Sequence, residues 1–297
     1  MLKYRLIFGT IMIAAFLGLA VFDGYLDGSI CQNSKEIFQF KGIIISGLFV
    51  ILAIVAMLEI RTLFSKAGVK IFLPTSIPLT ILIGTAWASA QLIIMAYPNI
   101  SPEKIRLVAC LLFAAVAIWA TFLYQALKFG TDNVIKNCSA NIFAIFYIGF
   151  LAGFILAIRI DFGVWALLMY IFTIKSSDIG AYTAGRLFGK HKFSPSISPG
   201  KTWEGVVGAV IFSAIVASLF AHFLYIIPLW TAALFGAAMA FLGQLSDLAE
   251  SMIKRDAQQK DSSNSVPGFG GILDIIDSLM MPAPVAYAVF CYFTGNI

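Results

Sequence analysis

Residues 42–60 read GIIISGLFVILAIVAMLEI, an almost unbroken apolar run. Because a bilayer core about 30 Å thick is crossed by roughly 20 helical residues, this stretch predicts a transmembrane helix. Comparable runs stand at 5–22, 78–97, 105–126, 142–158, 162–175, 206–227, 229–246 and 279–294. The pattern predicts an all-α polytopic integral membrane protein with about nine transmembrane helices. Because the sixth and ninth runs are short, a total of roughly eight to ten stays open.

The composition agrees with a membrane protein. Of the 297 residues, 60% are hydrophobic and 12% are charged, and the mean hydropathy is +0.93. A soluble domain of this length needs far more charge to cover its surface. The net charge of +5 is too small to indicate nucleic-acid binding. The first run follows Lys3 and Arg5, as in a signal peptide, but it lacks a small-residue cleavage site, which favours an uncleaved first helix.

The positions of lysine and arginine predict the orientation. With the N-terminus inside, most of these residues fall in inner loops, as the positive-inside rule requires. Two polar stretches, 174–205 and 247–278, are then cytoplasmic, and a bacterial inner membrane is the expected location. We therefore divide the chain into N-terminal transmembrane helices over 1–173 and a C-terminal catalytic transmembrane region over 174–297. The outer loop 23–41 has no assigned purpose.

The first polar stretch has the composition of an anion site. It contains Lys175-Ser176-Ser177-Asp178, then Gly185-Arg186 and Gly189-Lys190, and then SPGKTWEG over 198–205. Small residues with Lys201 and Thr202 just before an apolar helix bring backbone N–H groups and a cation together, which favours phosphate binding. Charges that only set the topology are the alternative, above all for Lys190 and Lys192. The GxxxxGK[ST] spacing of a P-loop is absent.

The second polar stretch begins inside a predicted span. Asp247, Ser251, Lys254 and Arg255 stand at i, i+4, i+7 and i+8, so on a helix they share one face. A carboxylate, a hydroxyl and two cations near the membrane surface are typical of a site for a metal ion and a phosphate. The alternative is a solvated helix end with a surface pair of Asp247 and Ser251.

A Pro/Gly run and two carboxylates follow. The run Pro267-Gly268-Phe269-Gly270-Gly271 predicts a turn whose backbone can approach a ligand closely. Asp274 and Asp277 come one helical turn apart, directly before the last span. Paired carboxylates at a membrane border suit Mg²⁺, which takes oxygen ligands and often shares them with substrate phosphates. For Asp274, an N-terminal helix cap is the alternative.

Together these groups predict the transfer of a phosphorus group between anions. Such a reaction brings negative oxygens together, so cations and a divalent metal must neutralise them, and carboxylates must hold the metal. The chain has only 2 histidines, which argues against a histidine-rich metal centre. It also shows no Ser-His-Asp set, no HExxH motif and no dinucleotide fingerprint.

The C-terminal part of the chain resembles the phosphatidate cytidylyltransferases, also called CDP-diacylglycerol synthases. The signature of that family is S-x-x-K-R-x4-K-D, a short spacer, and P-G-H-G-G-x-x-D-R-x-D. The chain has the corresponding residues in the same order and spacing: Ser251, Lys254, Arg255, Lys260, Asp261, Pro267, Gly268, Gly270, Gly271, Asp274 and Asp277. The stretches GAYxxGRxFGK and SPGKTWEG also look like the family, so the resemblance covers roughly the last 130 residues. Phe269 and Ile275 stand where the family usually has His and Arg.

The resemblance implies that CTP and phosphatidic acid react to give CDP-diacylglycerol and pyrophosphate. It implies Asp247 and Asp274 as ligands of Mg²⁺, with Asp277 as an alternate ligand and a second, monovalent cation left open. The implied catalytic residues are Asp247, Ser251, Lys254, Arg255, Lys260, Asp261, Asp274 and Asp277. The implied substrate-binding residues are Ser177, Asp178, Arg186, Lys190, Ser198, Lys201, Thr202, Gly268, Gly270 and Gly271. The expected partners are CTP, phosphatidic acid, the lipid bilayer and a second copy in a homodimer.

Three alternatives stay open. One is a CTP-using enzyme that acts on another lipid phosphate, because nothing in the sequence fixes the lipid. Another is a catalytically inactive relative, which the changes at Phe269 and Ile275 favour. A transporter is the third, but it should carry charges in mid-span and Gly/Pro-broken helices in paired halves. The polar residues here gather instead at the predicted cytoplasmic ends of the spans.

Overall fold

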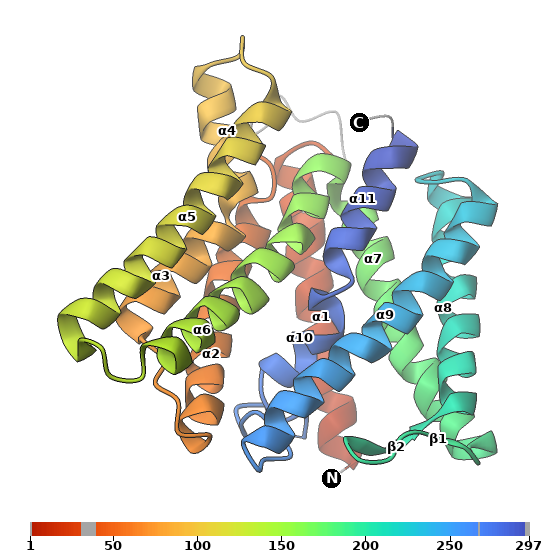
Figure 1. Cartoon of the computed structure of the whole chain (residues 1–297). Helices are drawn as coiled ribbons and strands as arrows, with labels where there is room; N and C mark the ends of the chain where they lie inside the picture. The colour runs from red at the N-terminus through yellow and green to blue at the C-terminus, as the bar shows by residue number, and fades with distance from the viewer. Residues whose placement is uncertain (1, 31–39, 267, 295–297) are drawn as a thin grey trace. The chain divides into compact units, whose positions relative to one another are not determined.

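The computed structural model describes residues 2–30, 40–266 and 268–294. Pro267 and residues 31–39 of the predicted outer loop 23–41 lie outside the described residues. The described elements are almost all helices, as predicted (Figure 1). In chain order they are α1 (Leu2–Leu26), α2 (Ile43–Lys66), α3 (Leu73–Gly84), α4 (Ala86–Ala96), α5 (Pro102–Phe129), α6 (Val134–Ile145), the π-helix η1 (Phe146–Leu151), α7 (Ala152–Phe188), β1 (Lys192–Ser194), β2 (Ser198–Thr202), α8 (Trp203–Leu224), α9 (Leu229–Asp256), α10 (Leu273–Met280) and α11 (Ala283–Thr294).

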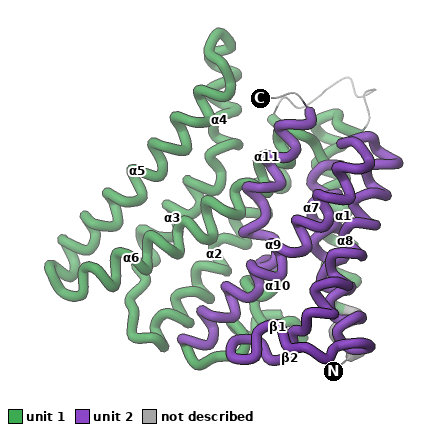
Figure 2. Tube along the Cα trace, turned by 45° about the vertical axis from the view of Figure 1, so that its right-hand side comes forward, with its two compact units in different colours: residues 1–164, 257–275 green, residues 165–256, 276–297 purple. Residues whose placement is uncertain are grey.

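The chain forms two compact units, which Figure 2 shows in two colours. Unit 1 comprises residues 1–164 and 257–275, and unit 2 comprises 165–256 and 276–297. The first boundary follows Gly163, whose φ of 84° and ψ of −179° interrupt α7. The functional division at residue 174 follows different bounds and stays a prediction.

Six helical segments of the described chain are long and apolar enough to cross a bilayer. The number reaches 8 if each of two bent pairs is one span: α3 with α4, at 57°, and α10 with α11, at 42°. The predicted count of nine is therefore not confirmed. The runs predicted at 142–158 and 162–175 fall in one segment of 55 residues, Val134–Phe188. If straight, that segment would be about 80 Å long, well beyond a single crossing, and Gly163 interrupts it near the predicted gap.

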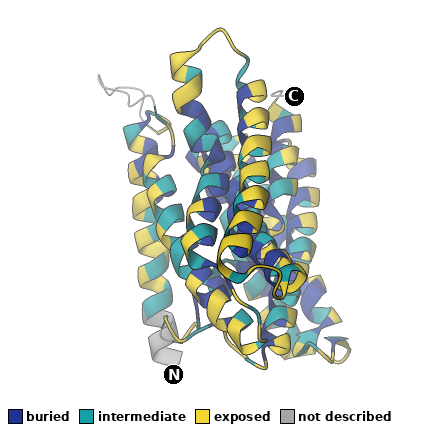
Figure 3. Ribbon diagram, turned by 60° about the vertical axis from the view of Figure 1, so that its left-hand side comes forward, coloured by how far each residue is buried: buried dark blue, intermediate teal, exposed yellow. Residues whose placement is uncertain are grey.

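The helices carry apolar side chains on their outward faces. On α5, Trp119 is 82% exposed and Leu127 is 75% exposed. Figure 3 shows that exposed residues run along the helices and are not confined to their ends. Contiguous exposed apolar surface of this extent is unfavourable in water and favourable in lipid. The protein is therefore an integral membrane protein.

In unit 1, α2, α3 and the η1–α7 region approach closely because three glycines lack side chains. A Cβ at Gly84 would overlap the ring of Phe49. A Cβ at Gly149 would lie 2.7 Å from the carbonyl oxygen of Thr80, and one at Gly153 would lie 3.0 Å from the backbone of Gly84. Since lipid tails are as apolar as the helices, such close packing of small residues is what holds the helices together.

A buried ion-pair network also joins distant parts of unit 1. Arg159 is fully buried, with its Nε 2.7 Å from Asp23 Oδ2 and its Nη2 2.8 Å from Asp27 Oδ2. Asp23 Oδ1 also accepts a hydrogen bond of 2.7 Å from the Ile44 N–H at the start of α2. Because buried charges are costly unless they are paired, this network links α1, α2 and α7.

In unit 2, α7 and α8 pack through glycines in the same way. A Cβ at Gly180 would lie 2.5 Å from the carbonyl oxygen of Gly208, and a Cβ at Gly208 would overlap the side chain of Ala184. The backbones of the two helices are therefore in direct contact, and neither glycine can be enlarged without moving a helix.

A two-stranded antiparallel hairpin between α7 and α8 is the one β element of the described chain, and the sequence did not predict it. Its strands pair with Lys192 opposite Thr202. The Phe193 and Trp203 rings meet edge to face, with centroids 4.8 Å apart. Thr202 Oγ1 accepts a hydrogen bond of 3.1 Å from the Gly205 N–H and so caps the N-terminus of α8. The hairpin thus holds the residue before this cap, Lys201, in a fixed position.

Candidate active site

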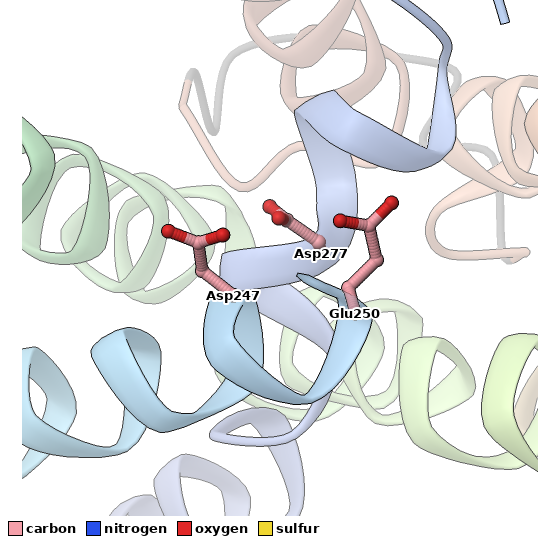
Figure 4. Close-up of side chains that lie close together, drawn as sticks. All are labelled: Asp247, Glu250 and Asp277. Atoms are coloured by element: carbon pink, nitrogen blue, oxygen red, sulfur yellow. The ribbon is translucent and has the colours of Figure 1, made fainter. Parts of the chain in front are cut away.

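Three carboxylates meet in unit 2. Asp247 and Glu250 come from α9 and Asp277 comes from α10, and one oxygen of each lies within 4.8 Å of the others (Figure 4). Glu250 and Asp277 are buried, and Asp247 is partly exposed. Asp247 and Glu250 are three residues apart, so they share a face of α9. The cluster therefore concentrates negative charge at a point that solvent can reach through Asp247.

Two serines, one through its side chain and one through its backbone, fix the α10 side of this cluster. Ser246 Oγ donates a hydrogen bond to the carbonyl oxygen of Asp277 and accepts one of 3.4 Å from the Met281 N–H. The Ser278 N–H donates to Asp277 Oδ1 at 2.5 Å. Ser246 stands directly before Asp247 in α9, so it ties the two carboxylate-bearing helices together next to the cluster.

Two lysines neutralise part of the charge on α9. Lys201 Nζ lies 2.9 Å from Asp247 Oδ2 and donates a hydrogen bond of 2.9 Å to the Gln244 carbonyl oxygen. Lys254 Nζ forms an ion pair with Glu250 Oε2, one helical turn away. Each lysine therefore stands where it could contact both a carboxylate and the phosphate of a bound anion.

α7 contributes a further polar group next to α10. Lys175 Nζ donates a hydrogen bond of 2.9 Å to Ser278 Oγ and lies 3.4 Å from Asp178 Oδ2. Ser177 is fully buried, and among the described residues its Oγ has no hydrogen-bond partner. This Oγ would be 3.9 Å from a Cβ at Gly243, one turn before the carboxylates of α9. A buried hydroxyl without a protein partner indicates a position for a ligand or water.

The carboxylate cluster fits a divalent cation that takes oxygen ligands. Mg²⁺ binds oxygens at about 2.1 Å in an octahedron, so neighbouring oxygens stand about 3 Å apart and opposite ones about 4.2 Å apart. The spacing of up to 4.8 Å between the carboxylate oxygens needs only a small inward movement to match this. Carboxylates this close repel one another, and a bound cation would remove the repulsion.

In unit 1, Asp274 organises the loop before α10. Its Oδ2 accepts hydrogen bonds from the Ser262 N–H at 2.9 Å, the Ser262 hydroxyl at 2.7 Å and the Gly271 N–H at 2.7 Å. The loop contains the predicted turn, with φ of 86° at Gly268 and 98° at Gly270, values that favour glycine. Because Asp274 and the carboxylate cluster belong to different units, the predicted pairing of Asp274 with Asp247 stays a prediction.

Glu59 of α2 also holds this loop. This buried carboxylate accepts hydrogen bonds from the hydroxyls of Ser262 and Ser263, at 3.2 and 2.7 Å. It also accepts hydrogen bonds from the N–H groups of Ile272 and Leu273, at 3.0 and 2.8 Å. Glu59 thereby caps the start of α10, the helix that carries Asp277.

Three residues of this loop bear on the family signature. Lys260 and Asp261 are exposed, and their roles stay predictions. Phe269, which stands where the family usually has His, lies against α1: a Cβ at Gly9 would be 3.1 Å from its Cζ. The replacement therefore gives α1 an apolar contact where His would offer a hydrogen-bonding ring.

Several other predicted site residues make contacts within unit 2. Ser251 Oγ lies 3.5 Å from Asp247 Oδ1, which is the pair named as the alternative to a ligand site. Arg255 Nε donates to the Ile197 carbonyl oxygen in the hairpin turn at 3.2 Å, and Ser198 begins the next strand. These contacts place Ser251 and Arg255 on the face of α9 that carries Asp247, as predicted.

Arg186 and Lys190 have local partners. Arg186 Nη1 donates a hydrogen bond of 2.8 Å to the Tyr182 hydroxyl, one turn earlier in α7. The Lys190 N–H donates to Glu204 Oε2 at 3.1 Å, which ties the end of α7 to the start of α8. A role in substrate binding stays a prediction for both residues.

Glu250 and Glu59 have no role in the site predicted from the sequence. Glu250 follows Asp247 by three residues, and this helical spacing alone indicates that the two carboxylates share a face. Glu59 is the single charged residue of the run 42–60, and an ionisable side chain inside a span is a functional candidate by default. Both signals were present in the sequence, but neither identified the partner across space.

The fold and the site define an integral membrane protein with a lysine-flanked acidic cluster on its helices. The model of the Cytidylyltransferase family matches residues 34–293. This match covers most of the chain, so the chain belongs to that family.

Three relatives named phosphatidate cytidylyltransferase share parts of the chain. The protein of Haemophilus influenzae is 42% identical over 133 residues, which are 43% of this chain and 46% of that protein. The protein of Mycobacterium leprae is 34% identical over 159 residues, 53% of this chain and 51% of that protein. The protein of Bacillus subtilis is 34% identical over 201 residues, 66% of this chain and 71% of that protein. The chain thus spans about half the length of the first two relatives.

Proposed function

We propose that the protein is an enzyme that condenses CTP with phosphatidic acid to give CDP-diacylglycerol and pyrophosphate. The observation that carries this proposal is the cluster of Asp247, Glu250 and Asp277, with Lys201 Nζ 2.9 Å from Asp247. All four residues lie in the part of the chain that the family model matches. The names of the relatives support the same activity.

In the proposed reaction, an ionised phosphate oxygen of phosphatidic acid attacks the α-phosphorus of CTP. A P–O–P bond to the lipid phosphate forms, the bond between the α- and β-phosphates breaks, and its electron pair leaves with pyrophosphate. Since the attacking oxygen is already ionised at neutral pH, no general base is required. Lys201 and Lys254 would bind phosphate oxygens and offset their charge, and Ser177 would contribute a hydroxyl contact.

We propose Mg²⁺ as the cofactor. Asp247, Glu250 and Asp277 are the residues whose oxygens are spaced to hold it. When bound, the ion would neutralise negative charge on the phosphate oxygens of the substrates. The competing assignment is the pair of Asp247 and Asp274, and a second, monovalent cation belongs to the same proposal.

An activity assay tests the proposed function. Purified protein in detergent receives CTP, Mg²⁺ and phosphatidic acid, and CDP-diacylglycerol is measured by mass spectrometry. We expect product that depends on Mg²⁺ and that falls by about 100-fold or more in Asp247→Asn. Asp132→Asn, at an exposed position of the α5–α6 turn, is the matched control and should keep full activity. Binding of CTP without product would instead support the inactive relative, and product from a different lipid phosphate would change the substrate.

Asp274→Asn separates the two metal assignments. Asparagine keeps one side-chain oxygen, which can accept the hydrogen bonds from Ser262 and Gly271, but it loses the charge. If Asp274 is a metal ligand, turnover should fall by about 100-fold or more. If it only organises the loop, turnover should stay within about threefold, and Asp277→Asn should cause the large loss.

We further propose that the N-terminus and the polar stretches face the cytoplasm of a bacterial inner membrane. The positions of lysine and arginine support this orientation, and the bacterial relatives support the membrane. Cysteine introduced at exposed Asn99, before α5, should react with a membrane-impermeant maleimide in intact cells, whereas cysteine at exposed Ser196, in the hairpin turn, should not. The reverse pattern would invert the topology. The proposed homodimer is tested by the mass of the detergent-solubilised protein in light scattering.

A further inference from the structure

Unit 1 contains a cavity of about 500 Å³ beside the loop that joins α2 to α3. Its wall includes two cationic side chains, Arg61 and Lys70, and three aromatic ones, Phe72, Tyr124 and Phe129. Lys70 Nζ lies 4.8 Å from the centre of the Phe129 ring. Cavities of this size, apolar with a few polar groups, are typical of sites for small molecules or headgroups.

Buried amide side chains fix the wall of this cavity. Asn141 Oδ1 accepts a hydrogen bond of 2.6 Å from the Phe72 N–H, and Asn141 Nδ2 donates one of 2.8 Å to the Lys70 carbonyl oxygen. Asn137 accepts a hydrogen bond from the Lys70 N–H and donates one to Gln125, both at 3.4 Å. All three amide residues are buried. Because buried amides must keep their hydrogen bonds, they hold the loop in one conformation, and the cavity is preformed.

The cavity is cationic. Arg61 and Lys70 form no ion pair with any carboxylate of the described chain. Lys66, Lys128 and Lys136 stand near the same ends of α2, α5 and α6 but outside the cavity wall. Two unpaired cations over a preformed, partly aromatic cavity favour an anionic ligand.

The apolar surface beside the cavity favours a phospholipid over a free phosphate as the anionic ligand. Tyr124 lines the cavity, and its α5 neighbours Leu123 and Leu127 are 60% and 75% exposed on the outward face of the helix. A phospholipid can place its phosphate at the cations and its acyl chains along α5, whereas a free phosphate uses the cations alone. We propose that this cavity binds the headgroup of an anionic phospholipid, with its phosphate between Arg61 and Lys70.

Lipid binding to the full-length, detergent-solubilised chain tests this site without CTP or turnover, so its outcome is independent of the proposed enzymatic function. Native mass spectrometry would measure the retention of added phosphatidylglycerol and phosphatidylcholine. The unaltered chain should prefer phosphatidylglycerol. One cation near a phosphate is worth about fivefold in affinity, so Arg61→Gln with Lys70→Gln should weaken phosphatidylglycerol binding at least about tenfold.

A second pair of substitutions controls for the loss of surface charge. Lys66→Gln with Lys128→Gln removes two exposed cations from the same helix ends, outside the cavity wall, and should change binding less than about twofold. The Lys70 contacts to Asn137 and Asn141 use backbone atoms, so Lys70→Gln leaves them intact. Equal losses in both double variants, or equal retention of the two lipids by the unaltered chain, would overturn the proposal. Displacement of the lipid by an equal concentration of inorganic phosphate would assign the site to the free anion instead.

Discussion

Replacing Asp277 with Asn tests the electrostatics of the carboxylate cluster. Two unit charges 4.8 Å apart repel by about 3.5 kcal/mol at an effective dielectric constant of about 20. Asp277→Asn removes two of the three pairwise repulsions among Asp247, Glu250 and Asp277, which is about 7 kcal/mol. Protonation of one carboxyl and the ion pairs of Lys201 and Lys254 with Asp247 and Glu250 relieve much of this repulsion. Asparagine retains an Oδ1 for the Ser278 N–H, so the packing of α10 should not change.

Asp277→Asn should therefore have two opposite effects: higher stability without a divalent cation and less stabilisation by Mg²⁺. After that relief is subtracted, Asp277→Asn should still remove about 1–3 kcal/mol of repulsion. Without divalent cations, the variant should therefore unfold at a temperature several degrees higher than the unaltered chain. With Mg²⁺, the unaltered chain should gain stability and the variant should gain little, because a ligand has been lost. The formation of CDP-diacylglycerol should fall by about 100-fold or more.

Thermal unfolding followed by tryptophan fluorescence, with Mg²⁺ or with EDTA, measures both effects. Asp132→Asn removes one exposed carboxylate outside the cluster and should shift neither midpoint. A variant that is less stable than the unaltered chain in EDTA and is still stabilised by Mg²⁺ would refute the reasoning, since the cluster would then neither repel nor hold the ion.

Three further predictions follow from single contacts. Lys201→Gln should lower the rate of CDP-diacylglycerol formation by about 100-fold, because it removes the cation that lies 2.9 Å from Asp247. The control Lys192→Gln, at an exposed position, should keep the rate of the unaltered chain. Equal rates in the two variants would exclude Lys201 from the site. Glu59→Gln replaces an acceptor of four hydrogen bonds with a weaker one, so limited proteolysis should cut the loop 257–272 faster, and an unchanged rate would contradict the capping role. Gly180→Leu should leave little monodisperse protein in gel filtration, because a side chain there would collide with the backbone of α8. Gly18→Leu, at a position that faces open space, should fold normally. A normal peak for Gly180→Leu would argue against tight packing of α7 on α8.

The transmembrane helices could be predicted because each one is an apolar run of sufficient length. All of the run 42–60 except Gly42 lies in α2, Ile43–Lys66, and the run 105–126 falls inside α5, Pro102–Phe129. The run 78–97 did not reveal the bend after Gly84, because the bend depends on packing against Phe49 and Gly149, far away in the sequence. The hairpin was missed because its strands are only three and five residues long, too short for a periodic pattern.

The helical face of α9 that carries several candidate site residues could be predicted. The spacing of Asp247, Ser251 and Arg255 correctly placed them on one face of α9, because helical periodicity is a local property. The sequence offered Asp274 and Asp277 one turn apart, but this spacing does not show which carboxylates each of them meets across space. Within unit 2, Ser246 of α9 contacts the carbonyl oxygen of Asp277, and this contact, which joins Asp277 to the α9 carboxylates, cannot be read from local spacing.

The ion-pair network of Arg159 has a consequence for the insertion of the chain during synthesis. Arg159 follows Asp27 by 132 residues, so at about 5–20 residues per second the ribosome makes the arginine roughly 7–26 s after the aspartates. Throughout that interval Asp23 and Asp27 lack their counter-ion, and the end of α1 lacks the ion pairs that join it to α7 in the finished chain. We therefore expect α1 of a nascent chain halted before Arg159 to be loosely inserted and extractable. Once α7 is complete, Arg159 can pair with both aspartates, and α1 should then be firmly anchored.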